Sequence, residues 1–174
     1  AIMAHDDIIR LSNRGVQLGQ SADRRGAEDA LRQALTMAEE RLGADDAITA
    51  VCLSNLGDFL RQQERHAEAE PLLQRAVASE ERLHGADALE TATALNNLAL
   101  LLRRMERYAE AEAMYRRVLP VFERGHGEQS VEVASVLNNL AQVHAHTGRP
   151  ELAEPLMRRV IELFERVRGA HHPD

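Results

Sequence analysis

The five-residue stretch LNNLA runs from Leu95 to Ala99 and returns from Leu137 to Ala141. Asparagine is a weak helix former, yet both copies stand inside apolar, helix-forming sequence. The second copy begins 42 residues after the first, and shifting the whole chain by that length brings many further positions into register. The stretch therefore marks one position of an internal repeat.

Four copies of this repeat fill the chain as a single array. Three of its columns hold an asparagine, a small residue and a closing glycine: Asn13, Asn55, Asn97 and Asn139; Gly15, Gly57, Ala99 and Ala141; and Gly43, Gly85, Gly127 and Gly169. The repeats run approximately over residues 6–43, 44–85, 86–127 and 128–169. Residues 170–174 are expected to begin a further, truncated repeat.

Each repeat has the pattern of two helices. In the third repeat Leu95, Leu98 and Leu102 share one helix face. A polar break follows, and a second apolar stripe extends to Phe122 before Gly127 ends the helix. Neither helix buries its stripe alone, so the hairpins must stack on one another. The pattern predicts an all-α solenoid of four antiparallel helical hairpins.

Composition excludes several classes of partner. The net charge of −7 argues against nucleic acid and anionic membranes, which both need a basic surface. Cys52 is the only cysteine, so neither an intramolecular disulfide nor a zinc framework is expected. No apolar run has the length of a membrane span, and no signal peptide is visible. We therefore expect a cytoplasmic protein.

Signs of catalysis are missing from the sequence. It contains no nucleophile elbow, no phosphate-binding loop and no convincing acid–base pair. His144 and His146 are two residues apart on a helix and so point to different faces, which does not suit a zinc site. His171 and His172 lie in the expected linker. We expect no enzyme activity, no metal site and no cofactor.

The repeat resembles a known family. Its order of large, small and aromatic positions is similar to the tetratricopeptide repeat (TPR): Leu95, Leu98, Ala99, Leu102, Tyr108, Ala111 and Tyr115. The length of 42 residues, against about 34 in the standard unit, together with LNNLA resembles the kinesin light chain subclass. The resemblance implies a right-handed superhelical solenoid that binds proteins.

Some positions depart from the pattern. Arg14 replaces a leucine, and residues 19–26 are polar, so we expect the first repeat to be degenerate, as a cap or a worn end. His144 replaces a core leucine. Pro120 falls inside the second helix of the third repeat and is expected to bend it.

The resemblance places one face of each first helix in a concave groove. The candidate peptide-binding residues on that face are Asn13, Asn55, Asn97, Asn139, Asn96, Asn138, Arg61, Arg103 and Arg104. An amide both donates and accepts hydrogen bonds, which suits the backbone of an extended peptide. The alternative is that the asparagines hold neighbouring helices at their spacing.

The arginines of this set favour an acidic or carboxylate-bearing peptide, because guanidinium pairs with carboxylate in a bidentate manner. The alternative is that they are solvated or pair with Glu64 and Glu106.

Two functions follow from these patterns. The first is a protein-interaction module that binds an extended, acidic peptide or partner segment in the groove. The second is a scaffold or self-association element without a free peptide ligand. In the last helix Ile161, Phe164 and Val167 have no following hairpin to cover them, so we expect the natural chain to continue, with self-association through this helix as the alternative. That end either packs on another copy or continues in a longer natural chain.

Overall fold

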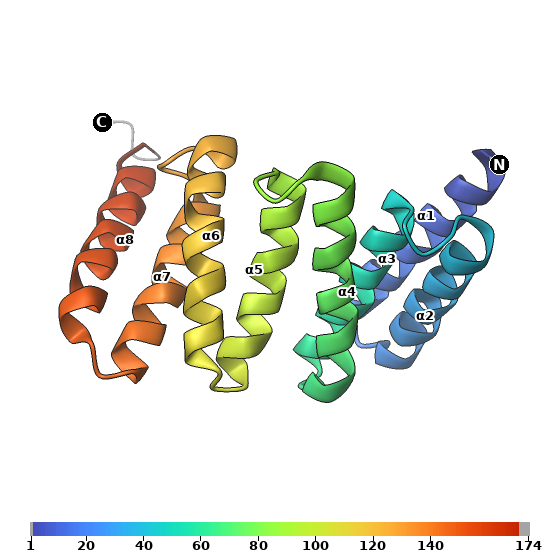
Figure 1. Cartoon of the computed structure of the whole chain (residues 1–174), viewed down its shortest axis with the longest axis horizontal. Coiled ribbons are helices and arrows are strands. Elements are labelled where there is room, and N and C mark those ends of the chain that lie inside the picture. Colours follow the sequence, from blue (N-terminus) through green and yellow to red (C-terminus); the bar gives the residue numbers. More distant parts are fainter. Residues whose placement is uncertain (1, 171–174) are drawn as a thin grey trace. The chain divides into compact units, whose positions relative to one another are not determined.

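The computed structural model describes residues 2–170, and within that range the chain forms eight α-helices and no strand (Figure 1). The helices are α1 (Ile2–Gly19), α2 (Arg24–Arg41), α3 (Ala47–Gln62), α4 (His66–His84), α5 (Leu89–Arg104), α6 (Tyr108–His126), α7 (Val131–His146) and α8 (Pro150–Ala170). The predicted all-α fold class is confirmed.

Consecutive helices pack in pairs, α1 on α2, α3 on α4, α5 on α6 and α7 on α8. The chain divides into two compact units, residues 1–86 (unit 1) and residues 87–174 (unit 2), each with two of these hairpins. Helices α3, α5 and α7 begin at residues 47, 89 and 131, and α4, α6 and α8 begin at 66, 108 and 150. The elements therefore recur at the 42-residue period of the sequence.

Specific residues set the ends of the helices. The side chain of Asp46 accepts a hydrogen bond from the backbone N–H of Ile48, at 2.8 Å, at the start of α3. After α2, α4 and α6 the chain turns at glycines with φ of +94°, +93° and +98°, namely Gly43, Gly85 and Gly127. These φ values suit glycine alone, which explains the glycine column of the repeat.

The fourth glycine of that column behaves differently. Gly169 lies inside α8, which extends to Ala170, so it does not end the helix as its counterparts do. Residues 171–174, which include His171, His172 and most of the expected further repeat, lie outside the described residues.

The turns inside the second, third and fourth hairpins use the left-handed region of φ as well. The residues there are Glu64 (φ +58°), Glu106 (φ +60°) and Gly148 (φ +72°). The backbone N–H of Arg65 then donates to the carbonyl of Leu60 at 2.9 Å, so the turn satisfies a carbonyl at the end of α3. The predicted break between the helices is thus one tight, repeated turn.

Small residues let the two helices of a hairpin approach closely. A Cβ atom on Gly15 would lie 2.7 Å from Cγ of Leu31, and one on Gly57 would lie 2.7 Å from Cδ2 of Leu73. Both leucines are buried, so neither position has room for a side chain unless the packing shifts.

At the positions that depart from the repeat pattern, the structure keeps the regular helices. The first repeat forms a complete hairpin, because residues 20–23 make only a short turn and Asp23 caps α2 by accepting from Gly26 N–H at 2.9 Å. Helix α6 continues through Pro120 without a break. His144 is buried as expected, and burial holds the pKa of its imidazole below the usual value.

No helix within residues 2–170 combines the length and the apolar character needed to cross a membrane.

Candidate binding groove

The first helices of unit 1, α1 and α3, pack side by side and leave two hollows along their shared face, of about 150 and 250 Å³. We call this face the α1–α3 groove. It is defined by Ile9, Asn13, Val16 and Gln20 on α1 and by Val51, Asn55, Asp58 and Gln62 on α3. Two of the nine predicted site residues, Asn13 and Asn55, line these hollows.

Apolar side chains stand open to solvent in the groove. Ile9 is 42% exposed, Val16 is 37% exposed and Val51 is 51% exposed. They alternate with the amides of Asn13 and Asn55 along the two helices. Such a mixture offers both contact for apolar side chains and hydrogen bonds for a backbone.

Asn55 takes part in packing between the repeats. Its Nδ2 donates to Oγ of Ser12, at 2.9 Å, and Ser12 is buried on α1. The bond links the first helix of the second repeat to the first helix of the first. Half of the Asn55 amide is therefore engaged in the scaffold, while Asn13 is exposed to solvent.

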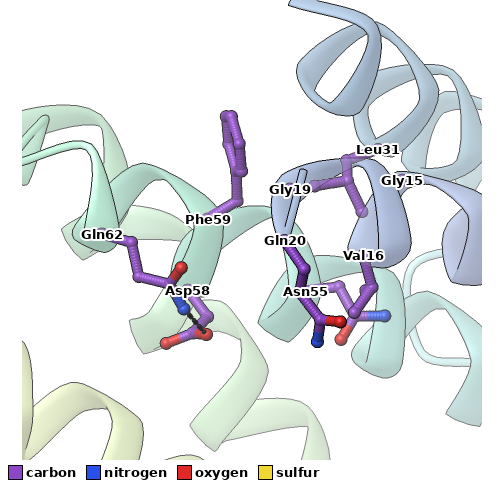
Figure 2. A pocket seen from close by; sticks show the side chains of 9 residues that line it. All are labelled: Gly15, Val16, Gly19, Gln20, Leu31, Asn55, Asp58, Phe59 and Gln62. Carbon is purple, nitrogen blue, oxygen red and sulfur yellow. Dashed lines mark hydrogen bonds between the residues drawn. The ribbon is translucent and has the colours of Figure 1, made fainter. Parts of the chain in front are cut away.

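The arginine nearest the groove is already paired. Asp58 accepts from Nε and Nη2 of Arg61, at 2.9 and 2.7 Å. Its other oxygen accepts from Nε2 of Gln62 at 2.8 Å, and Figure 2 shows that bond at the edge of the pocket. The charge of Arg61 is thus neutralised by a carboxylate in the groove. The partner is Asp58, and not the Glu64 considered from the sequence.

Unit 2 holds the remaining predicted residues. Asn97 is half-buried on α5, and Asn139 is buried on α7 with 7% exposure. Arg103 donates from Nη1 to Oε1 of Gln142 at 2.7 Å, which joins α5 to α7. Arg104 is exposed and forms no ion pair within residues 2–170.

The two further predicted asparagines, Asn96 and Asn138, lie on α5 and α7 of unit 2. The Oδ1 of Asn96 is buried and has no hydrogen-bond partner. Asn138 lies in a hollow between α7 and α8 with Met157 and Phe164. The predicted residues of unit 2 are therefore distributed over more than one surface.

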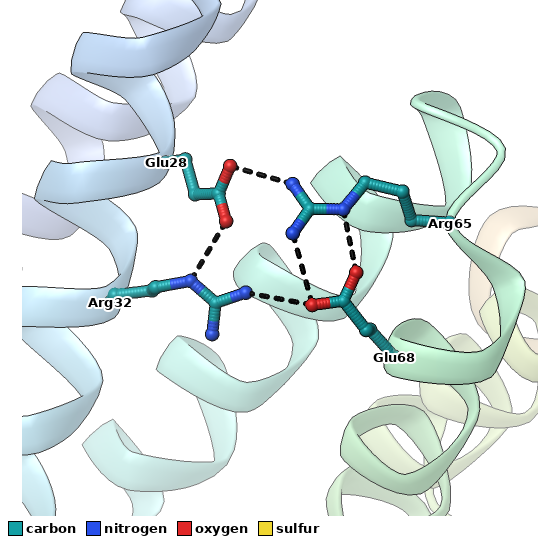
Figure 3. A network of polar contacts seen from close by, with 4 residues as sticks. All are labelled: Glu28, Arg32, Arg65 and Glu68. Atoms are coloured by element: carbon teal, nitrogen blue, oxygen red, sulfur yellow. Dashed lines mark hydrogen bonds and ion pairs between the residues drawn. The ribbon is translucent and has the colours of Figure 1, made fainter.

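A network of ion pairs that the sequence analysis did not single out ties the hairpins of unit 1 together (Figure 3). Arg65 precedes α4, and its guanidinium contacts Glu28 on α2 and Glu68 on α4, both at 2.6 Å. Arg32 bridges the same two carboxylates at 2.9 and 3.3 Å. Hydrogen bonding to Arg65 holds the pKa of both glutamates below the usual value.

Unit 2 repeats the central contact of this network. Arg149, which precedes α8, binds Glu112 on α6 at 2.5 Å, and Arg149 lowers the pKa of that carboxyl. The signal was present in the sequence, because Glu28 and Glu112 share one repeat column and Arg65 and Arg149 share another. Identifying them as partners required the fold, since nearly 40 residues separate each pair.

No group of three or more histidine, cysteine or acidic side chains that could hold a metal ion occurs among the described residues. Cys52 is a buried free thiol, and burial raises its pKa. His146 stacks on Tyr108 with ring centroids 5.3 Å apart.

Comparison with known families decides the identity of the fold. Family models of the tetratricopeptide repeat match residues 8–79, 53–124 and 133–174, which together cover most of the chain. The chain belongs to the tetratricopeptide repeat family. The tetratricopeptide repeat is a protein-interaction module, so the repeats of this chain form a protein–protein interaction scaffold. None of the curated proteins matches this TPR chain.

Solved structures show the same fold. BtubC (BKLC) from P. vanneervenii is 22% identical with a TM-score of 0.82, over 94% of this chain and 65% of BtubC. A Podosopora anserina kinesin light chain protein with nearly identical TPR-like repeats is 15% identical with a TM-score of 0.84, over 97% of this chain and 80% of the other. MamA from Desulfovibrio magneticus RS-1 has a TM-score of 0.69 at 14% identity, over 91% and 76%.

The TPR chain thus spans just under two thirds of the BtubC chain. The fold is that of the kinesin light chain-like TPR repeats, as the repeat length of 42 residues predicted.

Proposed function

We propose that this TPR protein binds an extended segment of a partner protein in the α1–α3 groove of unit 1. The observation that carries the proposal is the exposure of Ile9, Val16 and Val51 beside the amide of Asn13. Exposed apolar side chains next to unengaged polar groups are typical of binding surfaces. The partner would place apolar side chains in the two hollows and hydrogen-bond its backbone to the amides.

The two asparagines of the groove should not contribute equally to binding. Asn55 retains its Oδ1 for a ligand, because only its Nδ2 is used by Ser12. Asn13 and Gln20 are exposed. We therefore expect Asn13 to contribute more to binding than Asn55, whose replacement also removes a contact between repeats.

An acidic ligand remains a separate part of the proposal. Asp58 neutralises the charge of Arg61, so that charge is not free for a peptide carboxylate. Arg103 donates a hydrogen bond to the neutral amide of Gln142 and keeps its positive charge. Arg104, which is exposed, is the support for an acidic preference in unit 2. If it takes part, binding weakens as salt rises from 50 to 500 mM. The cytoplasmic location expected from the sequence remains a prediction.

The proposal is tested with a triple variant, Asn13→Ala, Val16→Asp and Val51→Asp. All three side chains are at least partly exposed, so we expect the fold to survive, which melting curves will check. The matched control is Val131→Asp with Ile161→Asp, the same chemistry on unit 2. Partners recovered from extract with the wild type and the control should be lost with the triple variant.

The opposite pattern of recovered partners would contradict the proposal that the α1–α3 groove is the binding site. A partner that the triple variant retains and the control loses binds at the end of unit 2, and it would support the scaffold alternative.

A further inference from the structure

The two hollows of the α1–α3 groove differ in chemistry. The larger one, of about 250 Å³, has a wall of aliphatic side chains from Ile9, Ile48 and Val51, together with the buried thiol of Cys52. We call it the apolar hollow. None of the described residues that line it is charged. An ionised side chain would lose its hydration there without gaining a partner, so the hollow suits an aliphatic or aromatic side chain.

The smaller hollow, of about 150 Å³, is lined by polar groups, and we call it the polar hollow. Figure 2 shows Asp58 and Gln62 of α3 on one side and Gln20 of α1 on the other, with Asn55 near Gln20. Asp58 is the one charged residue among those described that line it, and Arg61 neutralises it through two hydrogen bonds to Oδ1. A ligand carboxylate would meet the carboxylate of Asp58, and a ligand cation would meet the guanidinium of Arg61. A neutral amide therefore suits this hollow.

A hydrogen bond separates the two hollows. Ser12 lines the apolar hollow and Asn55 lines the polar one, and Nδ2 of Asn55 donates to Oγ of Ser12 at 2.9 Å. A ligand that fills both hollows must pass its backbone over this bond. Asn13 is exposed on α1 beside Ser12, and Oδ1 of Asn55 is not used by Ser12. These two amides can bond to the N–H and C=O groups of that backbone.

The helices set the distance between the hollows. The apolar hollow is lined by residues 9–13 of α1 and 48–52 of α3, and the polar hollow by residues 15–20 and 55–62. The two centres are thus about six to eight residues apart on each helix, which is about 9 to 12 Å. Extended chain advances about 3.3 Å per residue and points alternate side chains to the same side. Positions i and i+4, about 13 Å apart, therefore match the two hollows, whereas i and i+2 are too close.

The charge of the groove does not favour an acidic ligand. The chain carries a net charge of −7, and Asp58 is the one charged residue among the described residues that line the two hollows. The exposed Arg104 lies in unit 2, so the acidic preference considered for it does not concern this groove. The ligand complementary to the groove of unit 1 is therefore uncharged where it fills the hollows.

We infer that the α1–α3 groove selects an uncharged extended segment, with a large apolar side chain in the apolar hollow and an asparagine or glutamine four residues away in the polar hollow. This inference rests on the function proposed for the groove and names the chemistry of the partner segment. The distance between the hollows sets the spacing of the two anchors, and Asp58 excludes an acid from the second of them.

The spacing is tested by selection. A phage-displayed library of random dodecapeptides is selected on the 174-residue chain, and the selected clones are then tested on the triple variant Asn13→Ala, Val16→Asp and Val51→Asp. Clones that the triple variant no longer binds report on the groove. We expect these clones to share a large apolar residue and, four positions away, an asparagine or glutamine. No enrichment of aspartate or glutamate is expected at these positions.

One selected peptide, labelled with fluorescein, then gives dissociation constants by fluorescence anisotropy. Replacing its apolar anchor by alanine, or its amide anchor by glutamate, should weaken binding at least about tenfold in each case. Leu83→Asp, at an exposed site of α4 outside the groove, is the matched control in the protein and should leave the Kd unchanged. Raising the salt from 50 to 500 mM should change the Kd less than about twofold, because no ion pair forms.

The role of Asp58 is tested by Asp58→Asn, with melting curves to check the fold. The change keeps the shape of the side chain and leaves the charge of Arg61 without its carboxylate. The glutamate form of the peptide should therefore bind this variant at least about tenfold more tightly than it binds the wild type. If Asp58 has only a structural role, both forms of the peptide lose affinity equally, and the inferred preference is wrong.

Failure of the inference and failure of the proposed function can be told apart. If no selected peptide is lost with the triple variant, the function proposed for the groove fails, and this inference fails with it. If peptides that depend on the groove carry acids at the anchors, or lack the spacing of four, the groove binds peptides and only the inference is overturned.

Discussion

At the scale of the residue, the hairpin turns show how one backbone angle selects an amino acid. Glu64, Glu106 and Gly148 occupy the same position of three turns, and all have positive φ. Glycine adopts that region without the steric cost that a Cβ atom brings. The second and third repeats therefore carry a glutamate at a strained position, where the fourth repeat has the favourable glycine.

We predict that Glu106→Gly stabilises the protein. The left-handed conformation costs a residue with a side chain about 1 kcal/mol, and part of that is offset by the flexibility glycine adds to the unfolded chain. The free energy of unfolding in urea should rise by about 0.5 kcal/mol. The reverse change, Gly148→Ala, should lower it by about 1 kcal/mol. Two changes of the same sign would contradict this account.

At the scale of the element, the hairpins are joined by side chains from their turns. Arg149 immediately precedes α8, and two of its nitrogens donate hydrogen bonds to Glu112 on α6, at 2.5 and 3.4 Å. Arg116 contacts the same carboxylate from within α6 at 2.7 Å. One pair links two hairpins, while the other lies along a single helix.

The two pairs should differ in strength. A double-mutant cycle with Arg149→Ala and Glu112→Ala should give a larger coupling energy than the cycle with Arg116→Ala, because Arg149 binds Glu112 through two nitrogens. The matched cycle with Arg116→Ala should give about 0.3 kcal/mol, as for exposed pairs one turn apart. Equal couplings would mean that the contact between hairpins has no special weight.

The elements could be predicted because their signals are local and repeated. The 42-residue period, the apolar stripes and the glycines fixed the hairpins from sequence. The direction of each asparagine and arginine was not accessible in the same way. Asn55 and Ser12, or Arg103 and Gln142, meet across helices, and their partner depends on a rotation that the pattern of one helix does not define.

The first and last repeats show the same limit. The polar residues around the first turn predicted a degenerate repeat, whereas Asp23 makes that turn a capped helix start. Gly169 matched a column of turn glycines, yet it remains helical because a glycine permits a turn without requiring one.

At the scale of the whole molecule, stability should depend on pH through groups in both units. Burial lowers the pKa of His144, and arginine neighbours lower the pKa of Glu28 and Glu112. In each case the unfolded chain binds protons more readily than the folded one. Acid therefore favours unfolding, first below the ordinary histidine pKa of 6.5 and then below the ordinary glutamate value of 4.5.

We predict that the urea midpoint falls as the pH is lowered from 7 towards 5, with a contribution from His144 of at most about 1.4 kcal/mol per pH unit. His144→Leu should remove that contribution, because leucine occupies the same buried column at Leu60 and Leu102. His126→Gln, at an exposed site, is the control and should leave it in place. An unchanged pH dependence in His144→Leu would show that this imidazole does not titrate on unfolding.

The placement of a few rare residues gives each half of the protein its own native reporter. The chain has one cysteine, two tyrosines and no tryptophan. Cys52, the buried thiol, lies in unit 1, whereas Tyr108 and Tyr115 both lie in unit 2. Thiol-labelling kinetics therefore time the opening of the first half, and intrinsic tyrosine emission follows the second. Recorded on the same unmutated protein, the two traces distinguish a protein that opens as one cooperative body from one whose halves open in turn.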